Sequence, residues 1–266
     1  MKVALIQMTV VNDKNQNLQN AKSKIKEASL KGCEIICLPE MFNCPYDNRY
    51  FKDFAEDDYG KTITMIKSLA NDYNCIIIAG SIPEKYGNKI YNTSYVVDGD
   101  GKIISKHRKI HLFDVNVKDG ITFKESEILS PGNQITIVST KFAKIGLAIC
   151  YDMRFPEVIR KMALAGAEIV FIPAAFNMTT GPAHWHTLAK ARALDNQLYM
   201  ALCSPARNMD SSYTTYGHSL VANPWGQIEK ELNENESILI HEINLKAVKS
   251  VRESLPLLKH RKPELY

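Results

Sequence analysis

Apolar and polar residues follow each other along the chain in segments whose lengths indicate buried strands and amphipathic helices. Short, mostly apolar runs are typical of buried strands, and they occur at 3–7, 33–38, 75–82, 135–138, 144–149, 168–172 and 198–203. Helical runs lie between them at about 15–30, 61–71, 156–164 and 183–196. Turn residues at 98–101 and 223–226 predict hairpins, and 41–53 and 108–122 are interpreted as loops. Helices that alternate with buried strands predict sheets covered by helices.

The second half of the chain repeats the first in diverged form. Gly32-Cys-Glu-Ile-Ile-Cys-Leu-Pro-Glu-Met-Phe-Asn43 is similar to Gly166-Ala-Glu-Ile-Val-Phe-Ile-Pro-Ala-Ala-Phe-Asn177, and the order of the similar segments is kept. Chance likeness between two strands is the alternative, but the shared Pro and Phe-Asn positions argue against it. Two equivalent halves predict an α/β fold of two sheets packed face to face with helices outside. We therefore expect residues 1–266 to form one domain of four layers, α-β-β-α.

Composition and charge exclude several classes of protein. The 266 residues carry a net charge of +4 and are 45% hydrophobic. The sequence lacks the stripe of basic and aromatic residues that would indicate nucleic-acid binding. No apolar run approaches the roughly 18 residues of a membrane span. The chain starts directly with a strand and lacks a signal-peptide pattern. Six scattered cysteines without a CxxC pair favour reduced thiols, so a cytoplasmic location is expected.

Cys150 has the position of a nucleophile. It ends an apolar run, and Pro156 then opens an amphipathic run, so the thiol lies between a strand and the start of a helix. Backbone N–H groups there can lower the pKa of a thiol and hold an oxyanion. The alternative is a cysteine that only packs in the core, where this residue type is common.

Glu40 and Lys109 complete a workable set with Cys150. Glu40 and Ala174 are equivalent in the repeat, so only one half keeps a carboxylate at the end of a buried strand, where an acid needs a partner. Glu40 can take the thiol proton, and Lys109 with the backbone N–H of Tyr151 can hold the oxyanion. Each residue alone could equally be an exposed loop glutamate or a solvated lysine.

Histidine offers a competing arrangement. A Cys–His pair would serve the same chemistry, and His184 and His186 form the most conspicuous histidine cluster. They flank Trp185 at a helix start and are interpreted as packing or as lining on the substrate side. No clustered third ligand accompanies them in the sequence, so no metal is expected.

Three motifs resemble those of the nitrilase superfamily of carbon–nitrogen hydrolases: Leu-Pro-Glu40, His-Arg-Lys109-Ile-His-Leu-Phe and Ile-Cys150-Tyr-Asp-Met-Arg-Phe-Pro-Glu. The resemblance spans essentially the whole chain. It implies a Glu40–Lys109–Cys150 triad, internal pseudo-twofold symmetry, no cofactor and at least a homodimer. It also implies that Glu125 orients Lys109 or the attacking water, and that a C-terminal tail at about 250–266 packs at a subunit interface.

Within the superfamily the chain is most similar to the omega-amidase branch. The likeness is carried by the segments at 150–155, 176–185, 192–197 and 204–207. It implies hydrolysis of a small oxo-acid amide, 2-oxoglutaramate or 2-oxosuccinamate, to the oxo-dicarboxylate and ammonia through a cysteine thioester. His186 departs from the acidic residue of many relatives. Amidases that act on deaminated glutathione or N-carbamoyl compounds are alternatives, whereas a non-catalytic scaffold would be expected to lose part of the triad.

A dicarboxylic monoamide requires a cation for its distal carboxylate. Arg154 lies four residues beyond the nucleophile, and its fork of N–H donors suits a carboxylate; the alternative is a surface arginine at a helix start. Further candidates for pocket walls or hydrogen-bond donors, each also plausible as loop packing, are Tyr46, Phe113, Phe176, Met178 and Thr179.

Overall fold

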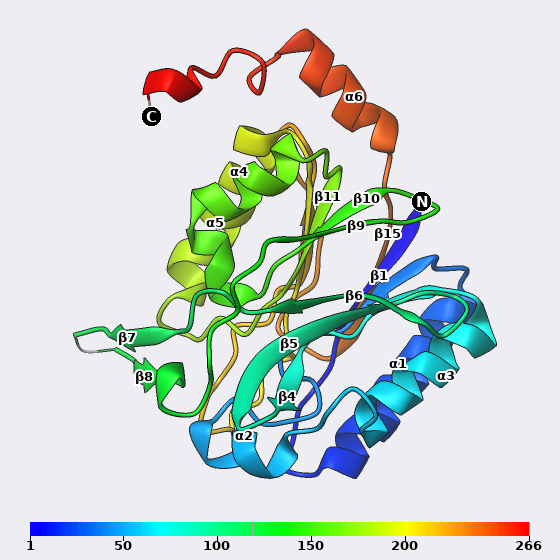
Figure 1. Ribbon diagram of the computed structural model, residues 1–266, viewed down its shortest axis with the longest axis vertical. Helices are drawn as coiled ribbons and strands as arrows, with labels where there is room; N and C mark the ends of the chain where they lie inside the picture. The colour runs from blue at the N-terminus through cyan, green and yellow to red at the C-terminus, as the bar shows by residue number, and fades with distance from the viewer. Residues whose placement is uncertain (119, 266) are drawn as a thin grey trace.

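Two sheets lie face to face in the computed structural model, which describes residues 1–118 and 120–265 (Figure 1). The strands of the first sheet are β1 (Lys2–Gln7), β2 (Ile35–Cys37), β3 (Ile76–Ile78), β4 (Ile82–Tyr86), β5 (Lys89–Val97), β6 (Ile103–Arg108) and β15 (Ser237–Glu242). Their order is β15-β1-β2-β3-β5-β4, with β6 paired to β5.

The second sheet is built from the other half of the chain. Its strands are β9 (Thr136–Ser139), β10 (Lys144–Leu147), β11 (Ile169–Pro173), β12 (Tyr199–Cys203), β13 (Leu220–Ala222) and β14 (Ile228–Glu231). They follow the order β14-β13-β12-β11-β10-β9. A separate small ribbon pairs β7 (Asp114–Asn116) with β8 (Thr122–Lys124).

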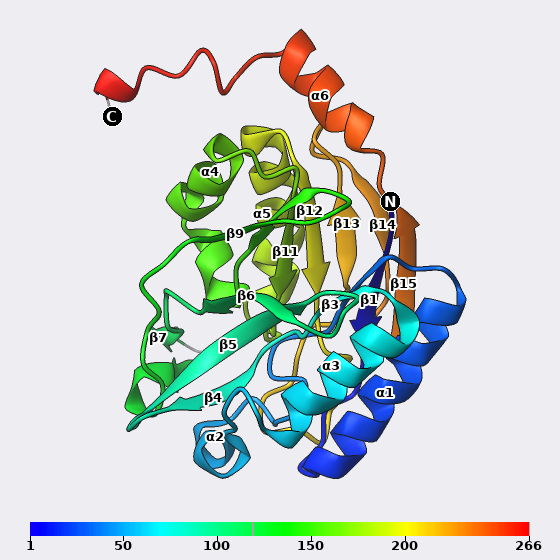
Figure 2. The same ribbon diagram turned by 45° about the vertical axis from the view of Figure 1, so that its right-hand side comes forward.

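Helices cover the outer face of each sheet (Figure 2). The helices are α1 (Lys14–Leu30), α2 (Asn48–Phe54), α3 (Lys61–Tyr73), α4 (Pro156–Leu164), α5 (Gly181–Asn196) and α6 (Leu245–Ser254). Helices α1 and α3 pack on the first sheet, and α4 and α5 pack on the second. The predicted four-layer α-β-β-α architecture is confirmed.

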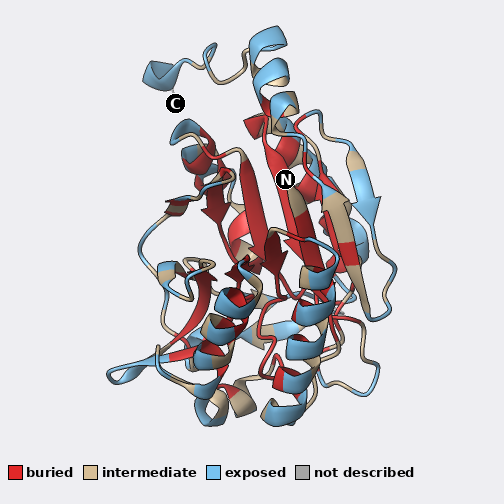
Figure 3. Cartoon of the chain, turned by 90° about the vertical axis from the view of Figure 1, so that its right-hand side faces the viewer, coloured by how far each residue is buried: buried red, intermediate tan, exposed pale blue. Residues whose placement is uncertain are grey.

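Alternation along the strands produces three stacked apolar layers. In β1, Val3 and Leu5 pack between the sheets, whereas Ala4 and Ile6 pack under α1 and α3. Because successive side chains of a strand point to opposite faces, strands that are apolar throughout are buried on both faces. Figure 3 shows this burial in the central strands, while the outer helix faces are exposed.

The pairing pattern confirms internal symmetry. Strands β1, β2 and β3 run parallel and β3 then pairs antiparallel with β5; strands β10, β11 and β12 run parallel and β12 pairs antiparallel with β13. An antiparallel strand flanks each set, β15 beside β1 and β9 beside β10. Gly32 and Gly166, equivalent in the repeat, both follow a helix at positive φ (76° and 93°), where glycine is favoured.

Several local predictions are corrected by the structure. The predicted strand 75–82 is split into β3 and β4 at Gly80, which has φ 43° and lies so close to the Pro39 carbonyl that any Cβ would collide. The predicted loop 41–53 contains most of α2, and 108–122 contains β7. Both short elements lie in segments of mixed polarity, where no regular period marks them.

The C-terminal segment leaves the body of the molecule after β15 (Figures 1 and 2). Arg252 of α6 donates hydrogen bonds to the carbonyls of Ala167 and Gln197, so the helix is attached near the ends of α4 and α5. Contact of the tail at about 250–266 with a second subunit stays a prediction, and Tyr266 lies outside the described residues. Among residues 1–118 and 120–265, no helix combines the length and apolar character that a membrane crossing requires.

Candidate active site

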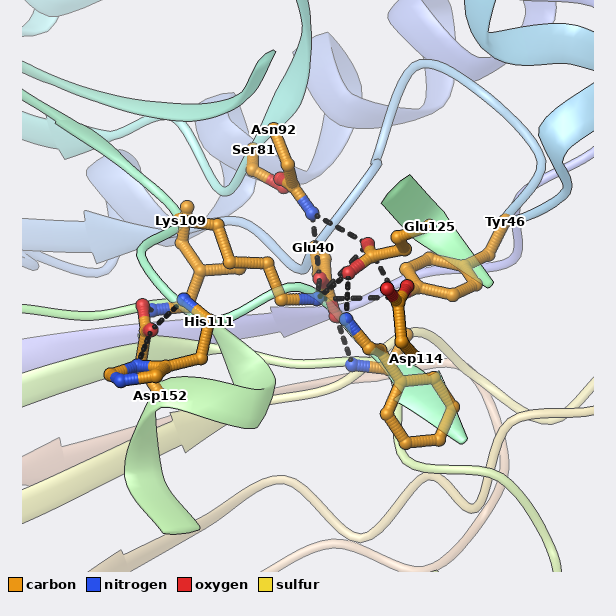
Figure 4. Close-up of polar contacts among 12 residues, drawn as sticks. Glu40, Tyr46, Ser81, Asn92, Lys109, His111, Asp114, Glu125 and Asp152 are labelled. Carbon is orange, nitrogen blue, oxygen red and sulfur yellow. Dashed lines mark hydrogen bonds and ion pairs between the residues drawn. The ribbon is translucent and has the colours of Figure 1, made fainter. Parts of the chain in front are cut away.

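The structure brings Glu40, Lys109 and Cys150 together from three strand ends. Glu40 follows β2, Lys109 follows β6 and Cys150 follows β10. The Nζ of Lys109 lies 2.9 Å from Oε1 of Glu40 (Figure 4), and the Glu40 carboxylate is close enough to the Cys150 thiol to raise the pKa of that thiol. Glu40 and Lys109 are fully buried and Cys150 is 5% exposed. The three predicted groups therefore meet in a site that excludes most water.

Cys150 occupies a strained turn. It begins a short 3₁₀ helix, Cys150–Arg154, with φ 46°, and α4 starts soon after at Pro156. Residues other than glycine rarely adopt a positive φ. The strain of this conformation persists only where the surrounding structure fixes it. Arg192 of α5 provides part of that support by donating to the carbonyls of Met153 and Arg154.

Both oxygens of Glu40 have defined partners. Oε1 accepts from Asn92 Nδ2 at 2.8 Å and from Lys109, and Oε2 accepts from the backbone N–H of Ala175 at 2.7 Å. Ala175 belongs to the second half of the chain, so this hydrogen bond joins the two halves at Glu40. The carboxylate is thus held in one orientation beside the nucleophile.

The electrostatics suit a proton exchange between Glu40 and Cys150. Burial raises the pKa of Glu40, Lys109 opposes this and Glu125 adds to it, so that the pKa is raised overall. Burial and the Glu40 carboxylate also raise the pKa of Cys150 well above its ordinary value despite Lys109. A neutral thiol is a weak nucleophile. The thiol therefore needs a base, and a desolvated carboxylate with a raised pKa is a matched acceptor.

Lys109 stays a cation in this buried place because two carboxylates face it. Burial alone would lower its pKa, but Glu125 and Glu40 raise it well above the ordinary value. Glu125 lies 2.9 Å from Nζ of Lys109, and its Oε2 accepts from the backbone N–H of Phe113 at 2.6 Å. Tyr46 donates to Glu125 at 2.7 Å and accepts from Lys109 at 3.2 Å. Glu125 and Tyr46 therefore position the lysine.

Asp152 ties the nucleophile turn to the segment that carries Lys109. Its buried carboxylate accepts from His107 Nε2 at 3.0 Å, from the backbone and ring nitrogens of His111 at 2.9 Å each, and from Ile149 N at 3.2 Å. Burial would raise the pKa of Asp152, but the hydrogen bonds from His107 and His111 hold it well below its usual range. The aspartate is thus an anionic clamp between two parts of the site (Figure 4).

Comparisons with known proteins show the family to which the chain belongs. The family model described as carbon–nitrogen hydrolase matches residues 2–253. The chain belongs to the carbon–nitrogen hydrolase family. It is 45% identical to omega-amidase NIT2 of Mus musculus, covering 100% of this chain and 96% of that protein, and 45% identical to omega-amidase NIT3 of Saccharomyces cerevisiae, covering 100% and 94%.

Solved structures of relatives share the fold of this carbon–nitrogen hydrolase. Saccharomyces cerevisiae Nit3, described as a member of branch 10 of the nitrilase superfamily, superposes with a TM-score of 0.90 at 43% identity, covering 98% of this chain and 96% of Nit3. The NitFhit protein of C. elegans superposes with a TM-score of 0.93 at 33% identity, covering 100% of this chain and 66% of that chain. These matches confirm the predicted superfamily and fold.

Arg154 of this hydrolase lies at the edge of the nucleophile turn. Its guanidinium is stacked 4.8 Å from the ring of Phe176, and its Nη1 lies 3.1 Å from Nδ1 of His184. The Nε of Arg154 is buried and has no hydrogen-bond partner among the described residues. A buried donor without a partner costs stability, which makes this N–H the unsatisfied group of Arg154.

The remaining predicted pocket residues fall into two groups. Phe113 and Phe176 are buried aromatic walls; Phe113 packs edge-on against Tyr151 at 5.2 Å. Met178 and Thr179 are exposed, and Thr179 lies against Gly120 in the turn between β7 and β8. Their contact with substrate stays a prediction, as does the oxyanion role of the Tyr151 N–H.

Sequence reasoning missed Asn92, Asp152 and Tyr213. Tyr213 donates to the Ala175 carbonyl at 2.9 Å and packs 4.6 Å from the ring of Tyr46. Asn92 lies in the middle of the long strand β5, where a polar residue in an apolar run is a usable signal for a buried partner. Asp152 lies within a recognised motif but had no assigned partner. Tyr213 lies in a loop, where no periodicity marks it.

Three side chains that could together hold a metal ion converge elsewhere in the described residues. His186, His218 and Glu231 place one ligand atom each within 4.8 Å of one another. None of the three belongs to the Glu40–Lys109–Cys150 arrangement.

Proposed function

We propose that this carbon–nitrogen hydrolase is an omega-amidase that converts 2-oxoglutaramate and 2-oxosuccinamate to the oxo-dicarboxylate and ammonia. The observation that carries this proposal is identity of about 45% to omega-amidases over the whole chain. The buried Glu40–Lys109–Cys150 arrangement supplies chemistry that fits amide hydrolysis.

The proposed first half-reaction forms a thioester. Glu40 takes the proton of the Cys150 thiol as the sulfur attacks the amide carbon. The tetrahedral oxyanion is stabilised by Lys109 and by the backbone N–H of Tyr151, in an environment where burial strengthens such interactions. Collapse breaks the carbon–nitrogen bond, and Glu40 gives its proton to the departing ammonia.

The second half-reaction hydrolyses the thioester. Glu40, again unprotonated, removes a proton from water as the water oxygen attacks the thioester carbon. The carbon–sulfur bond then breaks, and Glu40 returns its proton to the departing sulfur. This regenerates the Cys150 thiol and releases the oxo-dicarboxylate. The ordered environment of Glu40, with Asn92 and the Ala175 N–H holding it, allows one carboxylate to serve both halves.

Arg154 is the proposed partner of the distal carboxylate of the substrate. Its buried, unpartnered Nε and its fixed stacking on Phe176 leave a forked donor ready to receive an anion. A charge-assisted hydrogen bond of this kind is worth roughly 1.5–3 kcal/mol. This residue would therefore select short dicarboxylic amides over neutral amides.

The test is ammonia release from 2-oxoglutaramate, 2-oxosuccinamate and deaminated glutathione measured side by side. We expect the two short acids to be preferred and the Cys150→Ala variant to lose turnover by about 10⁴-fold or more. Arg154→Lys keeps the charge but loses the fork, so it should raise KM for the short acids at least about tenfold and leave a neutral amide of equal length unaffected.

Two results would contradict these assignments separately. Preference for deaminated glutathione would retain the triad but assign the enzyme to a neighbouring branch of the superfamily. Unchanged turnover in Cys150→Ala would remove the proposed nucleophile. We also propose, on the resemblance to the superfamily, that residues 1–266 work as one catalytic domain, that the chain forms at least a homodimer through its C-terminal tail, and that it acts in the cytoplasm.

A further inference from the structure

Two histidines and a glutamate converge on the outer side of the second half of the molecule. His186 comes from α5, His218 from the segment before β13, and Glu231 from the end of β14. Nε2 of His186 and Nδ1 of His218 each lie 2.8 Å from the same oxygen, Oε1 of Glu231. Segments far apart in the sequence therefore direct their ligand atoms to one point.

Both the backbone and the ring of His218 are held in place by neighbouring residues. Its backbone has φ 60°, its carbonyl accepts from Trp185 Nε1 at 2.7 Å, and its N–H donates to the Asn233 carbonyl at 3.2 Å. The ring of Tyr216 stacks on the imidazole at 4.3 Å. A non-glycine residue at positive φ costs free energy and marks a constrained position, and here the constraint directs the ring toward Glu231.

Glu231 and His186 are held by neighbouring elements. Glu231 is in register with Leu220 in the β13–β14 pair. Leu220 follows His218 by two residues, so the strand pairing holds Glu231 near His218. His186 lies next to Trp185, which is fully buried and bonded to the His218 carbonyl. The side chains of His186, His218 and Glu231 are 22–31% exposed. The cluster is therefore both preorganised and reachable from solvent.

We propose that His186, His218 and Glu231 form a binding site for a divalent transition-metal ion of the Zn²⁺ type. Two imidazoles and one carboxylate are a preferred ligand set for Zn²⁺, with water in the fourth position of an accessible site. Bonds of about 2.0–2.1 Å in a tetrahedron separate the ligand atoms by about 3.3 Å. The three ligand atoms now lie within 4.8 Å of one another, with each imidazole 2.8 Å from the carboxylate oxygen, so side-chain rotations bring them to this separation.

On metal binding, the proton that each imidazole shares with the carboxylate would move to the other nitrogen of the same ring, and the metal would take its place. In the protein without metal, Glu231 accepts from both rings; in the bound form the same three atoms donate their lone pairs to the cation. The site is separate from the hydrolytic chemistry, because none of its residues belongs to the Glu40–Lys109–Cys150 triad. Its occupancy is thus measurable without reference to turnover.

A neighbouring pair supplies a matched control. His241 Nε2 lies 2.7 Å from Oε2 of Glu229, and both residues are partly exposed, His241 on β15 at the edge of the first sheet and Glu229 on β14 at the edge of the second. This pair has the same imidazole–carboxylate contact. Among the described residues, however, it belongs to no group of three side chains that could hold a metal. One imidazole and one carboxylate hold a metal weakly, so His241→Ala should not change metal binding.

The test is calorimetric titration of Zn²⁺ into the full-length protein after removal of metals with a chelator. We expect one site per chain in the wild type and in His241→Ala. In His186→Ala and Glu231→Gln, the affinity should fall by more than about tenfold, the lower end of what loss of a mere supporting partner costs. Binding sites that involve the six cysteines would be common to all variants and would not follow this pattern.

His218→Asn provides the variant that separates folding from ligation. Asparagine tolerates positive φ but lacks the imidazole, so it should melt near the wild-type temperature and still lose the site. Absence of Zn²⁺ binding in the wild type would overturn the proposal. Equal affinity in the wild type and in all three ligand variants would also overturn it, because the metal would then be bound elsewhere.

Discussion

The ends of β2 and β11 are equivalent in the fold but opposite in chemistry. Each is a central, buried strand that ends at a proline-containing Leu/Ile-Pro step, and each is followed by one residue that is fully buried. That residue is Glu40 after β2 and Ala174 after β11. Only Glu40 is surrounded by polar partners: Asn92, Lys109 and the Ala175 N–H. The duplicated plan provides two similar places, of which one carries a charge.

The difference shows how the site is divided between the halves. The first half contributes both carboxylates and the ammonium, through Glu40, Glu125 and Lys109, and the second half contributes the thiol of Cys150 and the N–H of Ala175. Burying charges costs several kcal/mol per ion unless they are paired and hydrogen-bonded. The carboxylates are therefore tolerable only on the side that also supplies the lysine.

Among changes at the two strand ends, the largest expected effect comes from removing the charge that distinguishes them. Glu40→Gln keeps the shape but cannot accept the thiol proton, so kcat should fall by about 10²- to 10⁴-fold, the usual contribution of a general base. Steady-state ammonia release measures this change. The matched control is Glu34→Gln, which alters a carboxylate at the opposite end of the same strand, where Glu34 accepts from Lys2 N. Activity of Glu40→Gln within about threefold of the wild type would exclude the base role.

The converse substitution places a charge at the end of β11, where the wild type has the uncharged Ala174. Ala174→Glu would bury a carboxylate without a lysine nearby, and we expect the free energy of unfolding to fall by about 2–4 kcal/mol. Urea denaturation measures it, and Ala174→Gln separates the effect of charge from that of volume. Protonation would relieve the charge, so the gap between the two variants should narrow as the pH falls toward the ordinary pKa of glutamate. Equal stability of both variants at neutral pH would show that volume alone decides.

The layers and the internal symmetry could be predicted because they follow from patterning. Runs that are apolar at every position are buried on both faces, and the likeness of Gly32–Asn43 to Gly166–Asn177 places those runs in equivalent positions. The break at Gly80 could not be predicted in the same way. It arises from the approach of a backbone to the Pro39 carbonyl, a contact between segments that sequence periodicity does not record.

The candidate site was predictable where a residue type carries its own signal. Glu40 was notable because its repeat partner is Ala174, and Cys150 because a strand gives way to a helix around it. Asn92 and Asp152 act through hydrogen bonds to groups distant in the sequence. The tertiary arrangement alone determines such partners. The metal cluster illustrates the same limit, since His218 and Glu231 lie far in sequence from His186.

The smallest effect is expected from substitution of Asp152, which tests whether this residue holds the two halves together at the site. Asp152 accepts hydrogen bonds from His107 and His111 of the first half and from Ile149 of its own half. Asp152→Asn places an amide group against several of these N–H donors. We expect kcat to fall about 10- to 100-fold, the cost of a small misplacement of catalytic groups, while KM stays nearly constant.

Stability against pH distinguishes this positioning role from a general loss of packing. The pKa of Asp152 is held low in the folded protein, so its stabilising contribution is complete above the unfolded pKa of about 3.9 and is lost as the pH falls toward the lower folded pKa. The stability gap between wild type and Asp152→Asn should therefore be full at neutral pH and should shrink below about pH 4. Asp72→Asn, on the exposed face of α3, is the control for the same chemical change. A gap that persists unchanged in acid, or wild-type kcat in Asp152→Asn, would show that the clamp does not couple the halves.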